Sequence, residues 1–295
     1  MIILSLLLFV INIYGFFVFL QTNNVHRHNI LTVEFLSVGQ GDSVLITAPN
    51  QNTVLIDSSP NEIVVRKISK ALKYPVKRID LFLATHADLD HIGGTPSLIK
   101  KYKVKDFAFN FDLKISNLTI EINQQLEKNK INKIILKAGD RIILDKLNNV
   151  VVDVYWPHSD FINKDKNENS IICVLRYNEI NFVLTGDAGK EVEKHLIDLY
   201  DRSYLSAEVL KLGHHGSDTS TSAVFLNAVS PDYVIISAGL DNKFGHPHEE
   251  VIQRVISYFK NGNNISEIEI DNRIKETKNG PVIFQTDGRD LWSKN

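Results

Sequence analysis

Cysteine is almost absent from this chain of 295 residues, which contains only Cys173. A single cysteine excludes an intramolecular disulfide, and it also excludes a zinc module built from several cysteines. Cys173 lies in the apolar run 170–175, which predicts a buried small side chain rather than a nucleophile. Because many extracytoplasmic bacterial proteins also lack disulfides, the shortage of cysteine does not assign the chain to a compartment.

Net charge is also small, because 33 lysines and arginines nearly balance 35 aspartates and glutamates and leave a formal charge of −2. This balance argues against a strongly basic protein that coats nucleic acid, although a local groove could still bind phosphate. Hydrophobic residues make up 43% of the chain and charged residues 23%. Such a globular composition excludes a disordered tail, a collagen-like fibre and a multi-span transporter.

One long apolar run occupies residues 1–20, which carry no charged side chain. Twenty helical residues span roughly 30 Å, the thickness of the hydrocarbon core of a bilayer. A cleaved signal peptide would begin with basic residues and end at a small-residue cleavage site, and neither is found here. We therefore predict a single membrane anchor over residues 1–20, with a signal peptide or a buried helix as alternatives. Arg27 weakly favours a cytoplasmic C-terminal flank.

Beyond residue 30, short apolar runs alternate with polar turns. The predicted strands cover residues 31–36, 43–47, 53–57, 81–84, 107–111, 134–136, 141–144, 150–155, 171–177, 181–184, 208–212, 233–237, 265–270 and 282–285. Helices are predicted over residues 61–72, 95–101, 190–200 and 220–229. Strand meanders with helices between them indicate two sheets with helices outside, an α+β arrangement. We predict one domain over residues 30–290.

The strongest chemical signal is the motif THADLDHIGG, residues 85–94, which directly follows a buried-type strand. It supplies four potential metal ligands within six residues: His86, Asp88, Asp90 and His91. Charged groups at the end of a buried strand are costly unless they meet a cation. Carboxylate oxygens together with imidazole nitrogens suit Zn²⁺ or Mn²⁺, and the alternation of these ligands could serve two metals side by side.

Three further polar clusters follow predicted strands. Asp187 lies in a TGD tripeptide, where its carboxylate could bridge two metals. His214 and His215 lie in an HHGS loop, and Asn242 and His246 lie in the loop after the strand at 233–237. Six of the ten histidines fall in these three clusters and the motif at 85–94 taken together, so chance is a poor explanation for them.

Together these motifs resemble the metallo-β-lactamase superfamily, whose hallmark is an H-x-H-x-D-H motif. Asp88 replaces the second histidine, and with the GQGD segment at 39–42 this variant is similar to the metallo-β-lactamase-like domain of ComEC DNA-uptake proteins. The resemblance continues through LIDSS (55–59), TGD (185–187), HHGS (214–217), GHP (245–247) and TDG (286–288), and it covers residues 31–290. It implies a four-layer αβ/βα sandwich with a metal site at one edge of both sheets.

The resemblance also implies the ligand set. The metal ligands would be His86, Asp88, Asp90, His91, Asp187 and either His214 or His215, holding two divalent ions, Zn or Mn. The superfamily has a further histidine where this chain reads Asn-Glu-Asn-Ser at 167–170, so one metal is expected to be held more weakly or to take water. His246 would be a ligand or a contact to a substrate phosphate.

Two metals roughly 3.5–4 Å apart can clamp a phosphodiester and generate a hydroxide. Asp90 is assigned to that chemistry, and His215 or His246 would orient the phosphate or protonate the leaving group. Ser217 and Asn242 are predicted to bind substrate, although a simple helix cap explains Ser217 equally well. The remaining candidates, Asp42 and Asp57, would orient metal-bound histidines, with an ordinary turn aspartate as the alternative.

Three functions stay open at this point. The first is a metal-dependent phosphodiesterase acting on DNA or RNA, for which the lysines at 100, 101, 103 and 105 could track a strand, although a solvated face explains them better. The second is a hydrolase of another ester, such as a phosphocholine ester or a thioester. The third is a binding module of an uptake complex. A basic groove would favour the first function, and a closed pocket would favour the second.

The resemblance also implies that the domain is extracytoplasmic. Because one span cannot form a DNA channel, it further implies a membrane channel as a candidate partner.

Overall fold

The structure is a computed structural model that describes residues 29–72, 78–110, 115–159, 163–262 and 266–294. The predicted membrane anchor, residues 1–20, lies outside these residues. Within the described ranges, no helix combines the length and the apolar character needed to cross a membrane.

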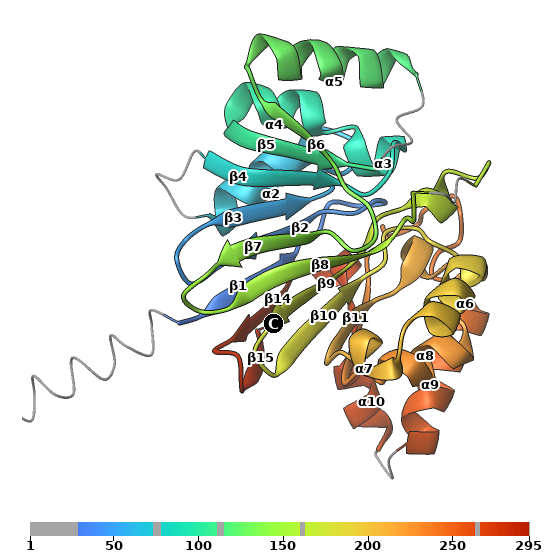
Figure 1. The fold of residues 1–295 in the computed structure, drawn as a ribbon. Helices are drawn as coiled ribbons and strands as arrows, with labels where there is room; N and C mark the ends of the chain where they lie inside the picture. Colours follow the sequence, from blue (N-terminus) through green and yellow to red (C-terminus); the bar gives the residue numbers. More distant parts are fainter. Residues whose placement is uncertain (1–28, 73–77, 111–114, 160–162, 263–265, 295) are drawn as a thin grey trace, which may run out of the picture.

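Two mixed sheets face each other at the centre of the molecule (Figure 1). The first sheet has eight strands in the spatial order β15 (Leu291–Lys294), β14 (Val282–Thr286), β1 (Leu31–Phe35), β2 (Val44–Thr47), β3 (Thr53–Ile56), β4 (Arg78–Ala84), β5 (Lys103–Phe109) and β6 (Asn132–Ile135). The second has seven, in the order β13 (Ile274–Glu276), β12 (Tyr233–Ile236), β11 (Val209–Lys211), β10 (Ile180–Leu184), β9 (Ile172–Tyr177), β8 (Val150–Trp156) and β7 (Arg141–Asp145).

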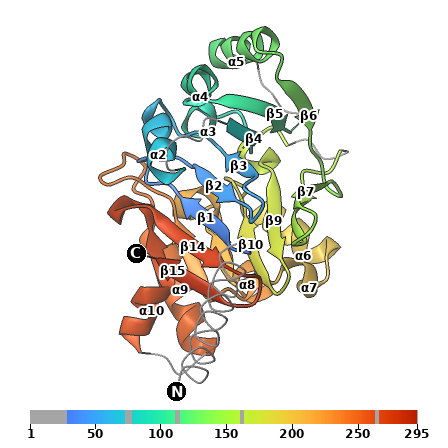
Figure 2. The same cartoon turned by 90° about the vertical axis from the view of Figure 1, so that its left-hand side faces the viewer.

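Helices cover the outer face of each sheet, as Figures 1 and 2 show. The first sheet carries α2 (Ile63–Ala71), α3 (Leu89–Ile92), α4 (Thr95–Lys101) and α5 (Asn117–Lys128). The second carries α6 (Lys190–Leu199), α7 (Arg202–Leu205), α8 (Ala223–Val229), α9 (Glu249–Gly262) and α10 (Glu267–Arg273). Three short 3₁₀ turns complete the described elements: η1 (Asn167–Asn169), η2 (Gly213–Gly216) and η3 (Thr277–Asn279).

Three buried apolar clusters hold these layers together. One lies between the sheets and includes Phe35, Phe182 and Phe284, whose rings pack edge to face. The other two fill the space between each sheet and its helices. This arrangement confirms the predicted pair of sheets with helices outside.

The strand directions bring the predicted site residues to one edge. Strands β3 to β6 are parallel, and β10 to β13 are parallel in the other sheet. Ligand sites in α/β sheets form beyond the carboxyl ends of such strands. β2 is antiparallel to β3, so the residues just before β2 reach the same edge. Every predicted metal ligand lies in a loop or short helix at these strand ends.

The predicted strand over 265–270 is wrong for its described residues, which begin α10. The Ser266 side chain accepts a hydrogen bond from Glu269 N, and Glu269 bonds back to the Ser266 backbone, forming a capping box. This local pair of hydrogen bonds is the reason that a helix begins here rather than a strand. The predicted helix over 220–229 begins later, at Ala223, because Ser222 caps it. Helix α5, which the sequence analysis did not predict, also begins with a capping box, at Ser116.

Candidate metal centre

Four side chains form a cluster at the shared edge of the two sheets. Asp90 and His91 lie on α3, which follows β4. Asp187 follows β10, and His215 lies in η2, directly after β11. One ligand atom from each of these residues lies within 4.8 Å of the others. His91, Asp187 and His215 are buried, whereas the Asp90 side chain is 29% exposed. The cluster is therefore closed beneath and open to solvent on the Asp90 side.

Glycine permits the tight packing beneath this cluster. A Cβ atom on Gly41 would lie 2.3 Å from the Asp90 backbone oxygen, and the φ angle of Gly41 is +128°. A Cβ on Gly93 would lie 2.2 Å from the Pro60 backbone oxygen. Neither distance is tolerable for a real side chain, so only glycine lets the neighbouring loops hold α3 this closely.

Hydrogen bonds fix which nitrogen of each imidazole faces the cluster. His91 Nδ1 lies 2.7 Å from Asp57 Oδ2, and His215 Nδ1 lies 2.7 Å from the Ser237 backbone oxygen. Both oxygens accept hydrogen bonds, so Nδ1 carries the hydrogen in each ring and Nε2 keeps a free lone pair when the ring is neutral. The two Nε2 atoms lie 3.2 and 3.4 Å from Asp187 Oδ2.

The cluster has the donor atoms that a divalent cation requires. The Nε2 atoms of His86, His91 and His215 and Oδ1 of Asp187 are buried and have no hydrogen-bond partner among the described residues. Leaving one buried polar group unsatisfied costs about 1–3 kcal/mol, so four together need a common partner. Imidazole nitrogen and carboxylate oxygen at a bridging position suit Zn²⁺, Mn²⁺ or Fe²⁺. The residues present therefore fit a metal ion.

The charges in and around the cluster also favour binding of a cation. Burial opposes charge on Asp187, but His215 and His91 hold its pKa well below its usual range. Burial likewise opposes charge on His215, but Asp187 and Asp42 raise its pKa to about 10. His86 behaves differently, because burial and the neighbouring His91 lower its pKa to about 3. The carboxylates thus attract positive charge, and His86 offers a neutral lone pair.

A candidate position for a second metal, beside His86, has a less complete set of ligands. His86 Nε2 lies 3.8 Å from Asp88 Oδ2, and the other Asp88 oxygen forms an ion pair with Lys166. Ser170 lies in the segment 167–170, where the superfamily pattern has a histidine, and its hydroxyl lies 3.2 Å from both His86 Nδ1 and Asp187 N. A second cation here would compete with the ammonium of Lys166. That one metal is held more weakly than the other stays a prediction.

Replacing Lys166 with methionine should strengthen that weaker position. Lys166→Met removes an ammonium group from Asp88, and both side chains are only partly exposed, at 39% and 23%. We expect the second Mn²⁺ ion to bind a few-fold to about tenfold more tightly, while the first is unaffected. Titration calorimetry on metal-stripped protein measures both affinities. Lys164→Met, in the same loop, is the matched control, and unchanged affinity for the second ion in Lys166→Met would contradict the assignment.

The remaining predicted site residues surround the cluster. His214 Nε2 lies 3.9 Å from Asp187 Oδ2 and its side chain is 26% exposed, so of the two adjacent histidines His215 completes the cluster and His214 lies at its rim. His246 lies next to His214, with the centres of the two rings 5.4 Å apart. Asn242 bonds within its own loop: its Oδ1 accepts from the His246 backbone nitrogen and its Nδ2 donates to the His246 oxygen. Ser217 is buried and accepts a hydrogen bond from the Thr219 hydroxyl.

Asp57 and Asp42 contact the two histidines of the cluster from behind. Asp57 accepts hydrogen bonds from Thr85 N and Thr85 Oγ1 in addition to its contact with His91. Asp42 Oδ1 lies 3.4 Å from His215 Nδ1, and Asp42 Oδ2 lies 2.6 Å from the Lys211 ammonium. Lys211 is only 2% exposed. Lys211 was not among the predicted site residues, although a lysine inside the predicted apolar strand at 208–212 was a usable signal.

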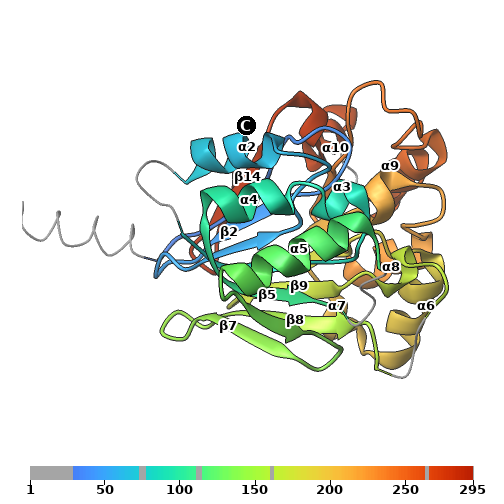
Figure 3. The ribbon, with the colours of Figure 1, turned by 90° about the horizontal axis from the view of Figure 1, so that it is seen from above.

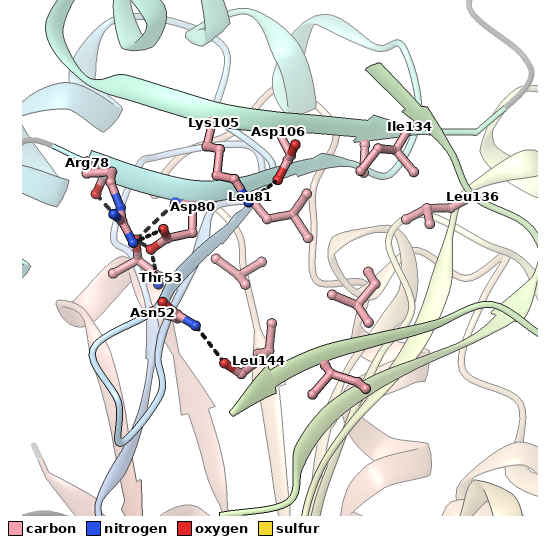
Figure 4. A pocket seen from close by; sticks show the side chains of 14 residues that line it. Asn52, Thr53, Arg78, Asp80, Leu81, Lys105, Asp106, Ile134, Leu136 and Leu144 are labelled. Carbon is pink, nitrogen blue, oxygen red and sulfur yellow. Dashed lines mark hydrogen bonds and ion pairs between the residues drawn. The ribbon is translucent and has the colours of Figure 1, made fainter. Parts of the chain in front are cut away.

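Two cavities lie away from the cluster. The first, of about 410 Å³, opens between the edges of the two sheets and contains none of the predicted site residues (Figure 4). Arg78 and Thr53 in its lining lie at the starts of β4 and β3, the strand ends opposite the cluster. The second, of about 940 Å³, lies between α2 and α4.

The fold and the metal cluster together assign the chain to a class of metal-dependent hydrolases. The model of the metallo-beta-lactamase superfamily matches residues 36–239, and the chain belongs to that superfamily. Among solved structures, the metallo-beta-lactamase fold protein YhfI from Bacillus subtilis aligns with a TM-score of 0.52 and 9% identity, covering 90% of this chain and all of that one. This likeness shows the fold. The chain is a metal-dependent hydrolase of this superfamily with a His/Asp metal site.

Two curated relatives carry Com names. The chain is 29% identical over 238 residues to ComE operon protein 3 of Bacillus subtilis, covering 75% of this chain and 30% of that protein. It is 30% identical over 230 residues to Competence protein ComA of Neisseria gonorrhoeae, covering 77% and 30%. The predicted resemblance to the ComEC branch is confirmed. The chain spans about a third of the length of these relatives.

Proposed function

We propose that this protein is a metal-dependent phosphodiesterase that cleaves DNA or RNA. The observation that carries the proposal is the convergence of two buried imidazoles, those of His91 and His215, on Asp187, with Asp90 open to solvent beside them. A divalent ion held there would polarise a phosphoryl oxygen and supply a hydroxide nucleophile at neutral pH. Asp90, His91, Asp187 and His215 would hold one ion, and His86, Asp88 and Asp187 a second, with Zn or Mn as candidates.

The chain's own residues have distinct tasks in this proposal. Asp57 and the Ser237 carbonyl keep His91 and His215 oriented toward the metal position. Burial, with His214 and His215 nearby, lowers the pKa of His246 to about 4. A neutral His246 is suited to a hydrogen bond with a substrate oxygen rather than to proton donation. Asn242 positions His246, and Ser217 supports the loop on the opposite side.

A basic groove supports a polymeric substrate. The cavity between α2 and α4 is lined by four exposed cations: Arg66, Lys70, Lys100 and Lys101. Lys100 lies 3.8 Å from Glu121, and no ion pair is found for the other three within the described part of the chain. Figure 3 shows the two helices side by side, with α3 at one end. An open groove lined by cations suits a nucleic-acid backbone better than a small ester does.

The groove is continuous with the loop that holds the metal centre. Asn61 lines its near end, and the preceding residue Pro60 packs against Gly93. Ser58 N donates a hydrogen bond of 2.6 Å to the His91 backbone oxygen. The segment 58–61 therefore links the backbone of a metal ligand to the near end of the groove.

Metal depletion and reconstitution test the proposed function. The full chain, purified in mild detergent and stripped with EDTA, is assayed with Mn²⁺ or Zn²⁺ on labelled single-stranded DNA, RNA and bis(p-nitrophenyl) phosphate. We expect cleavage that requires added metal. Bound metal with hydrolysis only of a thioester or phosphocholine ester would favour the other hydrolase, and bound metal with no hydrolysis would favour a binding module.

Removing charge from the groove should weaken polymer binding selectively. In the double variant Arg66→Gln with Lys101→Gln, the slope of log affinity against log salt for single-stranded DNA should fall by about 1.4, because each phosphate contact contributes about 0.7. Turnover of bis(p-nitrophenyl) phosphate should be unchanged. Lys103→Gln with Lys105→Gln, which removes the same charge from β5, is the control. Equal salt slopes in both double variants would exclude the groove as the binding track.

We further propose that residues 1–20 anchor the protein in a membrane, with the domain over 30–290 extracytoplasmic and beside a membrane channel. Strand β1 is antiparallel to β2, and β2 to β3, so β1 begins at the edge opposite the metal centre. Asn29, just before it, bonds through its backbone oxygen to the Tyr177 hydroxyl. An anchor on that side would leave the metal centre facing away from the bilayer. Protease accessibility of the domain in intact cells tests this orientation.

A further inference from the structure

The loop that carries Asn242 and His246 also presents an aromatic ring beside the metal centre. Phe244 is 50% exposed, and its ring stacks on that of His246 with centres 5.7 Å apart and planes inclined by 22°. The His246 ring lies 6.2 Å from that of His215 in the cluster. The rings of Phe244, His246 and His215 therefore lie one after another between the solvent and the metal cluster.

The backbone around Phe244 is held on both sides. Phe244 N donates to Asn242 Oδ1 at 3.2 Å, and Gly245 N donates to the Asn242 backbone oxygen at 3.2 Å. Asp218 N donates to His248 Nδ1, so Nε2 of that ring carries the hydrogen and donates to the Phe244 oxygen at 3.2 Å. An exposed apolar ring on a loop this well bonded is positioned before any ligand arrives, which lowers the entropic cost of binding.

The residue next to the ring supplies a matching charge. The ammonium of Lys243 lies 4.9 Å from the centre of the Phe244 ring. An exposed cation–π contact of this kind is worth only about 0.5–1 kcal/mol, whereas stacking of one base on an aromatic side chain is worth about 1–3 kcal/mol. A base can therefore displace the ammonium from the ring, and the released ammonium is then free to pair with the adjoining phosphate.

We propose that Phe244 is a stacking platform for a nucleobase next to the scissile phosphate. The proposal rests on the proposed function and deepens it: the substrate would be single-stranded nucleic acid, recognised partly through the flat face of a base and without sequence preference. Phe244 would thus determine preference for nucleotides over other phosphodiesters, while Lys243 would contact the phosphate on the same strand.

Paired substrates test the role of the ring. The full chain in detergent with Mn²⁺ is given a short oligothymidylate and the same oligomer with every base removed, and kcat/KM is measured for each. We expect wild type to favour the base-containing oligomer by roughly 5- to 150-fold, the equivalent of one stacked base. Phe244→Leu should lose this preference without changing kcat/KM on the abasic oligomer, and Phe244→Trp should keep it.

A matched control separates recognition from structure. Tyr204→Leu removes an aromatic ring of similar exposure, 52%, from α7 and should leave the preference unchanged. Equal losses on both substrates in Phe244→Leu, or an intact preference, would overturn the proposal. If wild type cleaves neither these oligomers nor RNA nor bis(p-nitrophenyl) phosphate, the phosphodiesterase proposal fails, and fluorescence anisotropy with the same pair of oligomers tests whether Phe244 binds a base. Base-dependent affinity that Phe244→Leu removes supports it, and base-independent affinity rejects it.

Discussion

Asp187→Asn is expected to remove most of the bound metal and all measurable hydrolysis. Asp187 Oδ2 lies 3.2 Å from His91 Nε2 and 3.4 Å from His215 Nε2, so it occupies the centre of the ligand set. Loss of a residue that only orients a metal ligand typically costs 10- to 100-fold in metal affinity or activity. Loss of the central carboxylate should exceed roughly 100-fold in both. Metal content and hydrolysis rate after reconstitution with Mn²⁺ measure the effect.

Asp57→Asn should lose less metal affinity and activity than Asp187→Asn. Asp57 touches His91 Nδ1 and Thr85 rather than the open face of the cluster, so its substitution should fall within the 10- to 100-fold range. Circular dichroism checks that both variants are folded. An Asp187→Asn variant that binds as many metal ions as wild type, or a larger loss in Asp57→Asn than in Asp187→Asn, would show that the cluster is not the centre of the site.

The catalytic edge was predictable because its residues follow strands in a recognisable order. The motif at 85–94 supplies Asp90 and His91 from one short helix, and TGD and HHGS supply Asp187 and His215 from the other sheet. The position of these motifs after predicted strands indicated a site, and the resemblance to the metallo-β-lactamase superfamily implied that it lies at one edge of both sheets. The structure shows the physical reason, since parallel strands place their carboxyl ends at one edge. The choice between His214 and His215 was not predictable, because both have left-handed φ angles, 46° and 57°, that a sequence does not display.

Contacts between distant segments account for what the sequence did not indicate. Lys166 meets Asp88 across 78 positions of chain, and Ser170 meets His86 across 84. Neither pair leaves a periodic or spaced pattern. The error at 265–270 has a different cause, because the residues of the capping box, Ser266 and Glu269, are close together in the sequence and were themselves a local signal for a helix start. Local capping should be weighed first in short segments.

Lys211→Met is expected to destabilise the fold by roughly 3–5 kcal/mol, the usual cost of leaving one buried charge without its partner. The Lys211 ammonium lies 2.6 Å from Asp42 Oδ2 and also donates to the backbone oxygens of Gly186 and Leu212. Both charged side chains are at most 3% exposed. The methionine side chain is unbranched and only one atom shorter than that of lysine, so most of the loss should come from the carboxylate of Asp42 rather than from a cavity. The urea midpoint of EDTA-treated protein measures it.

A double variant separates charge from packing in this pair. Asp42→Asn with Lys211→Met removes both charges, and neutral replacement of a whole buried ion pair is often near neutral in stability. We therefore expect the double variant to be more stable than Lys211→Met alone. The pair lies directly behind His215, since Asp42 Oδ1 is 3.4 Å from His215 Nδ1. If the double variant recovers stability yet loses metal affinity, the buried pair serves to hold His215 in place. If Lys211→Met is as stable as wild type, Asp42 does not depend on this lysine for its charge.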